Sequence, residues 1–136
     1  MKNFRSLSKL SCKCIFSALL VSGIFTHECL AFWMKVTENA DVSVYADKGT
    51  IVRIGRNKRM DVLYDLRRTD ASGQRSIKSF EEFNCDTASA KSINAVGFAD
   101  RMGTGKVVRT MDYQSEWIPS GKNKNEQQLL YFVCAW

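Results

Sequence analysis

The sequence predicts an α+β domain in which a β-sheet is followed by one C-terminal helix. Apolar and polar residues alternate through most of residues 33–111, and a helical pattern begins only at Asn123. The cysteines add a third observation, because only Cys85 and Cys134 remain once an N-terminal leader is removed. We therefore predict that a disulfide joins the helix to the sheet.

The leader is predicted at residues 1–31. Four basic residues precede an uncharged apolar run at residues 14–25, and Cys29 and Ala31 are small residues at the third and first positions before a cleavage site. The apolar run is shorter than the roughly 20 residues needed to span a bilayer. We predict a signal peptide over residues 1–31 and an exported domain over residues 32–136; an uncleaved anchor is the alternative.

Removing the leader changes the charge of the chain. Four of the 20 basic residues and one of the 14 acidic residues lie in the leader, so the exported domain has 16 basic and 13 acidic residues and a net charge of +3. A basic stripe with interleaved aromatic residues is also missing, which argues against nucleic acid as a partner. About 105 residues suffice for one domain, and a pair of cysteines in an exported domain of this size predicts a disulfide.

Seven runs with strand character fill the region before the helix. They are residues 33–37, 42–46, 50–54, 59–66, 75–85, 89–98 and 106–111. A hairpin through Gly55 is predicted between the third and fourth runs. In the fourth run one set of alternating residues is predicted to be buried and the other to face water. The buried set is Met60, Val62, Tyr64 and Leu66, and the wet set is Arg59, Asp61, Leu63 and Asp65.

The parity of the run 75–85 predicts what lies beneath the helix. Cys85 must face the helix to reach Cys134, so Phe83 and Ile77, which share its face, are predicted to lie under the helix as well. Glu81 and Glu82 are adjacent and therefore face opposite sides of the sheet. We favour a solvated sheet edge for this pair over a paired-carboxylate site.

The helix is predicted to begin at Asn123. Asn123 lies three residues before Glu126, a spacing that satisfies the first free amides of a helix, and no Gly or Pro follows. Pro119 marks the end of the sheet. The apolar residues of the helix gather on one side, and they are Leu129, Leu130, Phe132, Val133 and Cys134.

No catalytic, cofactor-binding or metal-binding residue is predicted. The only histidine, His27, lies in the leader, so the exported domain has no imidazole for nucleophile activation or metal binding. The glycine-rich stretch 103–106 does not fit a phosphate loop, because Asp100 stands where that loop needs Gly and Val107 where it needs Ser or Thr. We predict that the protein is not an enzyme and uses no cofactor.

Two further features admit a ligand-binding alternative. Trp33 and Trp117 are interpreted as core residues, with stacking on a ligand as the alternative. Basic residues at the hairpin ends are interpreted as charges that keep sheet edges soluble, with a weak anion-binding patch as the alternative. They are Arg53, Arg56, Lys58, Arg59, Arg67 and Arg68.

Eight short motifs follow one another in a characteristic order along the exported domain. They are Trp33-Met-Lys-Val36, Val44-Tyr-Ala-Asp47, Thr50-Ile-Val-Arg53, Val62-Leu-Tyr-Asp-Leu66, Asn84-Cys-Asp86, Met102-Gly-Thr-Gly-Lys-Val-Val108, Trp117-Ile-Pro119 and Tyr131-Phe-Val-Cys134. In this order the chain resembles the surface-adhesin protein E family of small exported bacterial proteins. The resemblance implies a single antiparallel sheet of about six strands with a C-terminal helix held on one face by a disulfide, in agreement with the prediction from periodicity and cysteine count.

The resemblance also implies a function in binding host proteins such as matrix and plasma components. Neither Cys12 nor Cys29 suits lipid attachment, so the mode of surface anchoring stays open. We expect an exported binding module of the cell envelope, in the periplasm or at the cell surface, with a host or envelope protein as partner and no transmembrane segment in the mature chain. The alternative is a periplasmic structural or accessory protein.

Overall fold

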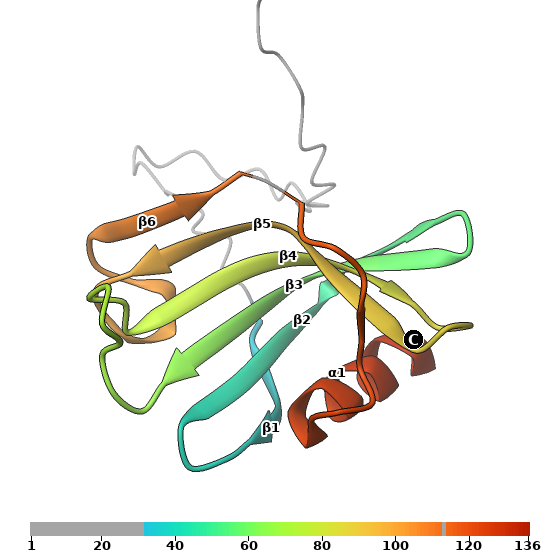
Figure 1. Ribbon diagram of the computed structural model, residues 1–136, viewed down its shortest axis with the longest axis horizontal. Helices are drawn as coiled ribbons and strands as arrows, with labels where there is room; N and C mark the ends of the chain where they lie inside the picture. Colours follow the sequence, from blue (N-terminus) through green and yellow to red (C-terminus); the bar gives the residue numbers. More distant parts are fainter. Residues whose placement is uncertain (1–31, 113) are drawn as a thin grey trace, which may run out of the picture.

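The computed structural model describes residues 32–112 and 114–136. The predicted signal peptide at residues 1–31, its cleavage site and His27 lie outside the described residues. Within them, the chain forms one seven-stranded sheet and one α-helix (Figure 1). The elements in chain order are β1 (Met34–Glu38), β2 (Val42–Ile54), β3 (Asn57–Leu66), β4 (Ser76–Asn84), β5 (Ser89–Phe98), the short 3₁₀ turn η1 (Arg101–Gly103), β6 (Val107–Met111), β7 (Ile118–Pro119) and α1 (Lys124–Ala135).

Each strand from β1 to β6 pairs antiparallel with its neighbour in sequence, so the order in the sheet follows the order in the chain. The two-residue strand β7 pairs with the start of β5. Short connections between antiparallel strands produce this meander without crossovers. The predicted single antiparallel sheet with a C-terminal helix is confirmed.

The runs predicted as separate strands at 42–46 and 50–54 belong to one strand, β2. A β-bulge between Asp47 and Val52 interrupts its pairing with β3. The Thr50 hydroxyl donates to the Asp47 carbonyl at 2.7 Å and accepts from the Asp61 amide at 2.9 Å, which holds the bulge against β3. Beyond it, β2 turns into β3 through Gly55 and Arg56, and the φ of 62° at Gly55 suits the first position of a two-residue hairpin turn.

Helix α1 begins where the sequence predicts. The Asn123 side chain accepts a hydrogen bond from the Asn125 amide at 2.8 Å, which caps the first turn. The helix packs over β1 to β4 at one end of the sheet (Figure 1). The core between them consists of Val44, Ala46, Met60, Val62, Phe83, Leu129 and Val133.

Polar bonds fix both ends of α1 on the sheet. Thr37 in β1 donates to the Asn125 side chain at 2.9 Å near the helix start. Lys58 in β3 donates its ammonium protons to the carbonyls of Val133 and Cys134, each at 3.2 Å. A cation at the C-terminal carbonyls is also favoured by the helix dipole.

The disulfide between Cys85 and Cys134 joins the end of β4 to the last turn of α1, as predicted. Phe83, two residues before Cys85, is fully buried beneath the helix. Ile77 lies on the same face but farther along β4, where it neighbours Tyr64, Ala95 and Met111 rather than the core cluster. The parity argument is therefore right for the face, while only Phe83 lies under the helix.

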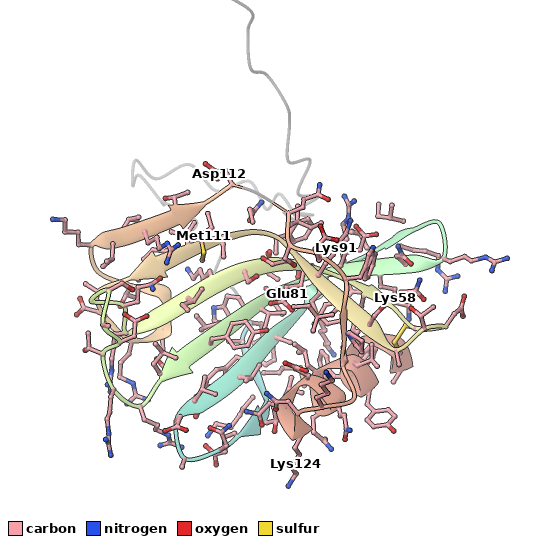
Figure 2. The ribbon with its side chains drawn as sticks, in the orientation of Figure 1. Lys58, Glu81, Lys91, Met111, Asp112 and Lys124 are labelled. Carbon is pink, nitrogen blue, oxygen red and sulfur yellow. A yellow bond between two sulfur atoms is a disulfide. The ribbon has the colours of Figure 1, made fainter. Side chains whose placement is uncertain are left out.

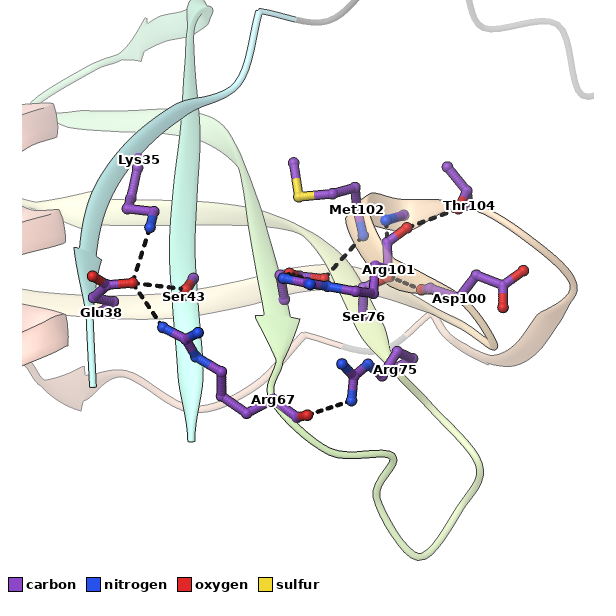
Figure 3. Close-up of polar contacts among 12 residues, drawn as sticks. Lys35, Glu38, Ser43, Arg67, Arg75, Ser76, Asp100, Arg101, Met102 and Thr104 are labelled. Atoms are coloured by element: carbon purple, nitrogen blue, oxygen red, sulfur yellow. Dashed lines mark hydrogen bonds and ion pairs between the residues drawn. The ribbon is translucent and has the colours of Figure 1, made fainter. Parts of the chain in front are cut away.

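The prediction that Leu63 and Asp65 face water is wrong. Both are buried on the side of the sheet opposite α1. At Asp65 the reason is the η1 turn, which folds over that end of β3 (Figure 3). Arg101 donates to Asp65 Oδ2 from Nη2 at 2.6 Å and from Nε at 3.0 Å. The Met102 amide donates to Asp65 Oδ1 at 3.0 Å, which holds Met102 at a left-handed φ of 55°.

Charge compensation keeps Asp65 ionised. Burial opposes the charged form, but hydrogen bonds from Arg101 and from the Met102 amide outweigh it and lower the pKa of Asp65 below its ordinary value. The next residue, Gly103, also has a left-handed φ, of 67°, and a Cβ there would lie 2.1 Å from Cε of Lys78. The left-handed φ of Gly103 therefore favours glycine at this position, and any Cβ would also require the Lys78 side chain to move.

We expect Cys134→Ser to detach α1 while most of the sheet remains. The cross-link joins residues 49 positions apart, and in the chain-entropy model its loss costs about 4 kcal/mol. Amide exchange measured by mass spectrometry should become fast across residues 125–135 and stay slow in β3 and β4. Tyr131→Ser is the matched control, because it changes an exposed position of the same helix. Wild-type protection of α1 in the Cys134→Ser protein would contradict this expectation.

Asp65→Asn should destabilise the protein by about 1.5–3 kcal/mol, the usual contribution of hydrogen bonds to a charged group. The reason is that the buried carboxylate receives bonds from both Arg101 and the Met102 amide. Glu38→Gln is the comparison, since Glu38 is half exposed and water screens its pairs with Lys35 and Arg67, so its loss should be smaller. Urea denaturation measures both values, and equal losses would show that burial of the Asp65 pair contributes nothing extra.

Candidate functional site

Helix α1 covers only one end of its side of the sheet and leaves a groove beside it. The groove has two adjoining pockets, which share Tyr64, Ser92 and Ser115. The inner pocket, next to α1, has a volume of about 250 Å³, and the outer pocket, which extends to Met111 of β6, has about 360 Å³. Figure 2 shows Glu81 near the middle of the sheet and Met111 towards the β6 edge. The groove is the candidate binding site.

Residues 114–120, which include β7, form one wall of the groove. The Ser115 amide donates to the Ser92 carbonyl at 2.9 Å, and the Ser92 amide donates to the Ser115 hydroxyl at 2.9 Å. The Ser120 amide donates to the Ala88 carbonyl at 2.9 Å. These bonds hold the segment along β5, so the groove is bounded by backbone that is itself hydrogen-bonded.

Glu81 lines the inner pocket. Its side chain accepts a hydrogen bond on Oε1 from the Tyr64 hydroxyl at 2.7 Å, and only 8% of the residue is exposed. The prediction of a solvated edge for Glu81 and Glu82 is wrong, because β4 lies between β3 and β5 and both residues are buried. The two side chains do face opposite sides of the sheet, as predicted.

Glu81 and Glu82 have opposite pKa shifts despite being adjacent. Burial raises the pKa of Glu81 to about 7; the hydrogen bond from Tyr64 partly offsets this, and the negative charge of Glu126 adds to it. Burial also opposes ionisation of Glu82, but hydrogen bonds from Asn57 at 2.6 Å and Arg59 at 2.9 Å lower its pKa below the ordinary value. Glu82 therefore has its own counter-charge, whereas Glu81 shares its pocket with a second carboxylate.

The core prediction for Trp117 is wrong, because 39% of the residue is exposed. Its ring makes a cation–π contact with the Lys91 ammonium, which lies 5.0 Å from the ring centroid. The same ammonium donates to Gln114 at 3.1 Å and lies 3.9 Å from Glu82. Lys91 thus lines the inner pocket at β5, while its ammonium contacts groups other than Glu81. Trp33 is partly buried.

Three of the basic residues singled out in the sequence are engaged within the chain. Arg59 pairs with Glu82 at 2.9 Å, Arg67 pairs with Glu38 at 2.8 Å, and Lys58 binds the end of α1. Lys58 and Arg59 lie near the start of β3, whereas Arg67 follows its last residue. The hairpin-end basic residues therefore form two separate groups, and Lys58, Arg59 and Arg67 have partners within the chain, which weakens the alternative of an anion-binding patch.

Within residues 32–112 and 114–136, no group of three or more His, Cys, Asp or Glu side chains is arranged to hold a metal ion. In the same part of the chain, no helix has the length and apolar character required to cross a membrane.

Sequence reasoning missed the Glu81 site, although one signal pointed to it. Glu81 has the same parity as Phe83 and Cys85, and parity alone places it on the helix side of β4. The partner hydroxyl of Tyr64 was correctly assigned to the buried face of β3. Their meeting depends on the register of β3 against β4, in which Met60 is opposite Glu81 and Tyr64 is opposite Ile77.

Comparisons with known proteins identify relatives of this fold. The family description "Surface-adhesin protein E" matches residues 33–135. The crystal form II structure of Haemophilus influenzae protein E has 12% identity and a TM-score of 0.61, with 79% of this chain and 91% of that chain covered. Its selenomethionine form has 12% identity and a TM-score of 0.60 over 79% and 89%. Protein E from non-typeable Haemophilus influenzae has 12% identity and a TM-score of 0.55 over 80% and 76%.

At 12% identity the structural matches show a shared fold alone. None of the curated protein sequences compared with this chain matches it significantly.

The raised pKa of Glu81 predicts that stability falls between about pH 5 and about pH 8. The pKa is about 7 in the folded protein against an ordinary 4.5, so the stabilisation is fully present below pH 4.5 and is lost as the pH rises through 7. The shift corresponds to about 3 kcal/mol. Urea denaturation of Glu81→Gln should show a flatter pH profile than wild type over this range.

Glu116→Gln is the matched control for that experiment, because it removes an exposed carboxylate from the neighbouring segment. It should keep the wild-type slope. Identical slopes for Glu81→Gln and wild type would contradict the assignment of the pH dependence to Glu81.

Proposed function

This chain belongs to the surface-adhesin protein E family, and we propose that it is an exported adhesin that binds host proteins at the cell surface. The observation that carries the proposal is the family match over residues 33–135, which spans nearly all of the described domain. The proposal includes a signal peptide at residues 1–31 and a binding domain at residues 32–136. The function is binding rather than catalysis.

Two features of the domain support the proposal of an exported binding protein. The Cys85–Cys134 disulfide suits an oxidising compartment. The single helix leaves a groove with hydrogen-bonded walls and both apolar and acidic groups. Pockets of this kind, with apolar walls and a few convergent polar groups, are the usual form of binding sites.

One large apolar side chain is also exposed at the groove. Ile118 is 54% exposed and lines the inner pocket. Trp117 is 39% exposed but lines neither pocket, and its ring contacts the Lys91 ammonium near Glu82. A partner that enters the groove would therefore meet Ile118.

We expect the purified oxidised domain to bind immobilised extracellular-matrix or plasma proteins saturably and to compete with whole cells for them. Ile118→Ala should weaken this binding by about tenfold if the groove is the contact surface, because burial of a large aliphatic side chain contributes about 1.5–3 kcal/mol. Surface plasmon resonance measures the loss. Tyr131→Ala is the control, since it removes an exposed aromatic ring from α1 away from the groove.

Location is tested separately on intact cells that produce the protein. Protease or antibody access before the outer membrane is breached supports the adhesin, and protection until it is breached supports a periplasmic accessory protein instead. N-terminal sequencing of the exported chain tests the boundary: a start near Phe32 agrees with cleavage after Ala31, and an intact Met1 contradicts it.

A further inference from the structure

We propose that the inner pocket is a binding site for an alkylammonium group, the chemistry of a lysine side chain on a protein or of a free primary amine. The inference concerns the ligand chemistry of one pocket, so it stands apart from the identity of any host protein. Only the choice of a lysine side chain as the natural source rests on the proposed adhesin function.

The shape and walls of the inner pocket suit an unbranched apolar stem. Its volume is about 250 Å³, and Phe83, Leu129 and Ile118 supply apolar surface. Phe83 and Leu129 are themselves fixed in the core, so these walls are preformed. A lysine stem buries its methylene groups along apolar surface of this kind while its ammonium seeks a polar partner.

The polar end of the pocket carries two carboxylates from different elements. Glu81 rises from β4, and Glu126 comes from the first turn of α1. The negative charge of Glu126 disfavours ionisation of Glu81, which places the two groups within electrostatic reach. A cation between them would relieve this repulsion and compensate for the burial of Glu81.

The described residues around Glu81 supply no counter-cation. The Tyr64 hydroxyl from β3 donates a hydrogen bond to Glu81, and Ser79 of β4 also lowers the pKa of Glu81. Lys91 from β5 directs its ammonium to Glu82, Gln114 and the ring of Trp117, and Lys58 binds the C-terminal carbonyls of α1. The causes of the Glu81 pKa shift accordingly include no basic group.

An ammonium fits the donor set better than a metal ion. Ca²⁺ takes six to eight oxygen ligands, and Mg²⁺ requires near-octahedral coordination. No group of three metal-ligating side chains occurs among the described residues, and Glu81 Oε1 already accepts a hydrogen bond from the Tyr64 hydroxyl. An ammonium needs only a few acceptors for its three protons, which Glu81, Glu126 and the hydroxyl of Ser92 can supply.

Binding of a cation at Glu81 must be linked to proton release. Because the free protein holds a proton on Glu81 with a pKa of about 7, the cation has to compete with that proton. The ionised fraction rises about 30-fold between about pH 5.5 and about pH 8, and affinity for the cation should rise by the same factor. An apolar ligand of the same length would show no such dependence.

The test is titration of the oxidised full chain with n-butylammonium, followed by ¹H–¹⁵N and Glu ¹³C chemical shifts at both pH values. We expect shifts at Tyr64, Glu81 and Leu129, about 30-fold tighter binding at the higher pH, and a fall in the apparent pKa of Glu81. n-Butanol should bind at least tenfold more weakly than n-butylammonium at the higher pH. Equal binding of the two probes would overturn the proposal.

Matched variants separate the carboxylates of the pocket from charge in general. Glu81→Gln should abolish the preference for n-butylammonium over n-butanol and its pH dependence, and Glu126→Gln should weaken n-butylammonium binding by at least threefold. Glu116→Gln, which removes an exposed carboxylate outside the pocket, should bind as wild type does. Unchanged binding by Glu81→Gln, with a native spectrum, would overturn the proposal.

A peptide arm identifies the source of the ammonium group. Acetyl-Gly-Lys-Gly-amide that produces the same shifts as n-butylammonium supports a lysine side chain, whereas binding of n-butylammonium without the peptide supports a free amine. Both results retain the alkylammonium site. Neither depends on the binding of matrix or plasma proteins, so failure of the adhesin proposal and failure of the alkylammonium site give different results.

Discussion

The Cys85–Cys134 disulfide decides which part of the sheet is covered. Helix α1 has 12 residues and is therefore about 18 Å long, whereas six strands side by side span about 24 Å and the longer strands extend about 30 Å. One helix of this size cannot cover one whole side of such a sheet. Since the disulfide fixes its last turn at the end of β4, and the Thr37–Asn125 bond fixes its first turn at β1, the groove is the area that remains.

On the opposite side of the sheet, the η1 turn is held against β3 by an ionic contact. Arg101 and the Met102 amide bind the buried carboxylate of Asp65, so this contact attaches η1 to the sheet as the disulfide attaches α1. The two sides respond to acid in opposite ways. Stabilisation by Asp65 requires its ionised form and is lost at low pH, whereas stabilisation linked to Glu81 is present in acid and lost as the pH rises through about 7. These two groups together favour weakly acidic conditions.

Local patterns in the sequence were sufficient for the elements but not for what covers them. Alternation located β3 to β5, the Asn123 spacing located the start of α1, and the count of cysteines gave the correct tether, because each depends on neighbouring residues or on elimination. The burial of Asp65 depends on Arg101, 36 residues later, and no local pattern contains that contact. β2 was divided into two runs because its bulge is held by Thr50 and Asp61, which meet only through pairing with β3.

The candidate site was missed for a related reason, and Glu81 and Glu82 show which physical factor separates them. The two residues are adjacent and almost equally buried, with 8% and 5% exposed, so burial alone cannot account for pKa shifts in opposite directions. The difference lies in the partners: Glu82 meets Arg59 and Asn57, and Glu81 meets a phenol and a second carboxylate. Because alternation sends consecutive side chains to opposite sides of a strand, one carboxylate can stabilise the sheet while its neighbour in the groove has no counter-charge among the residues that the structure describes.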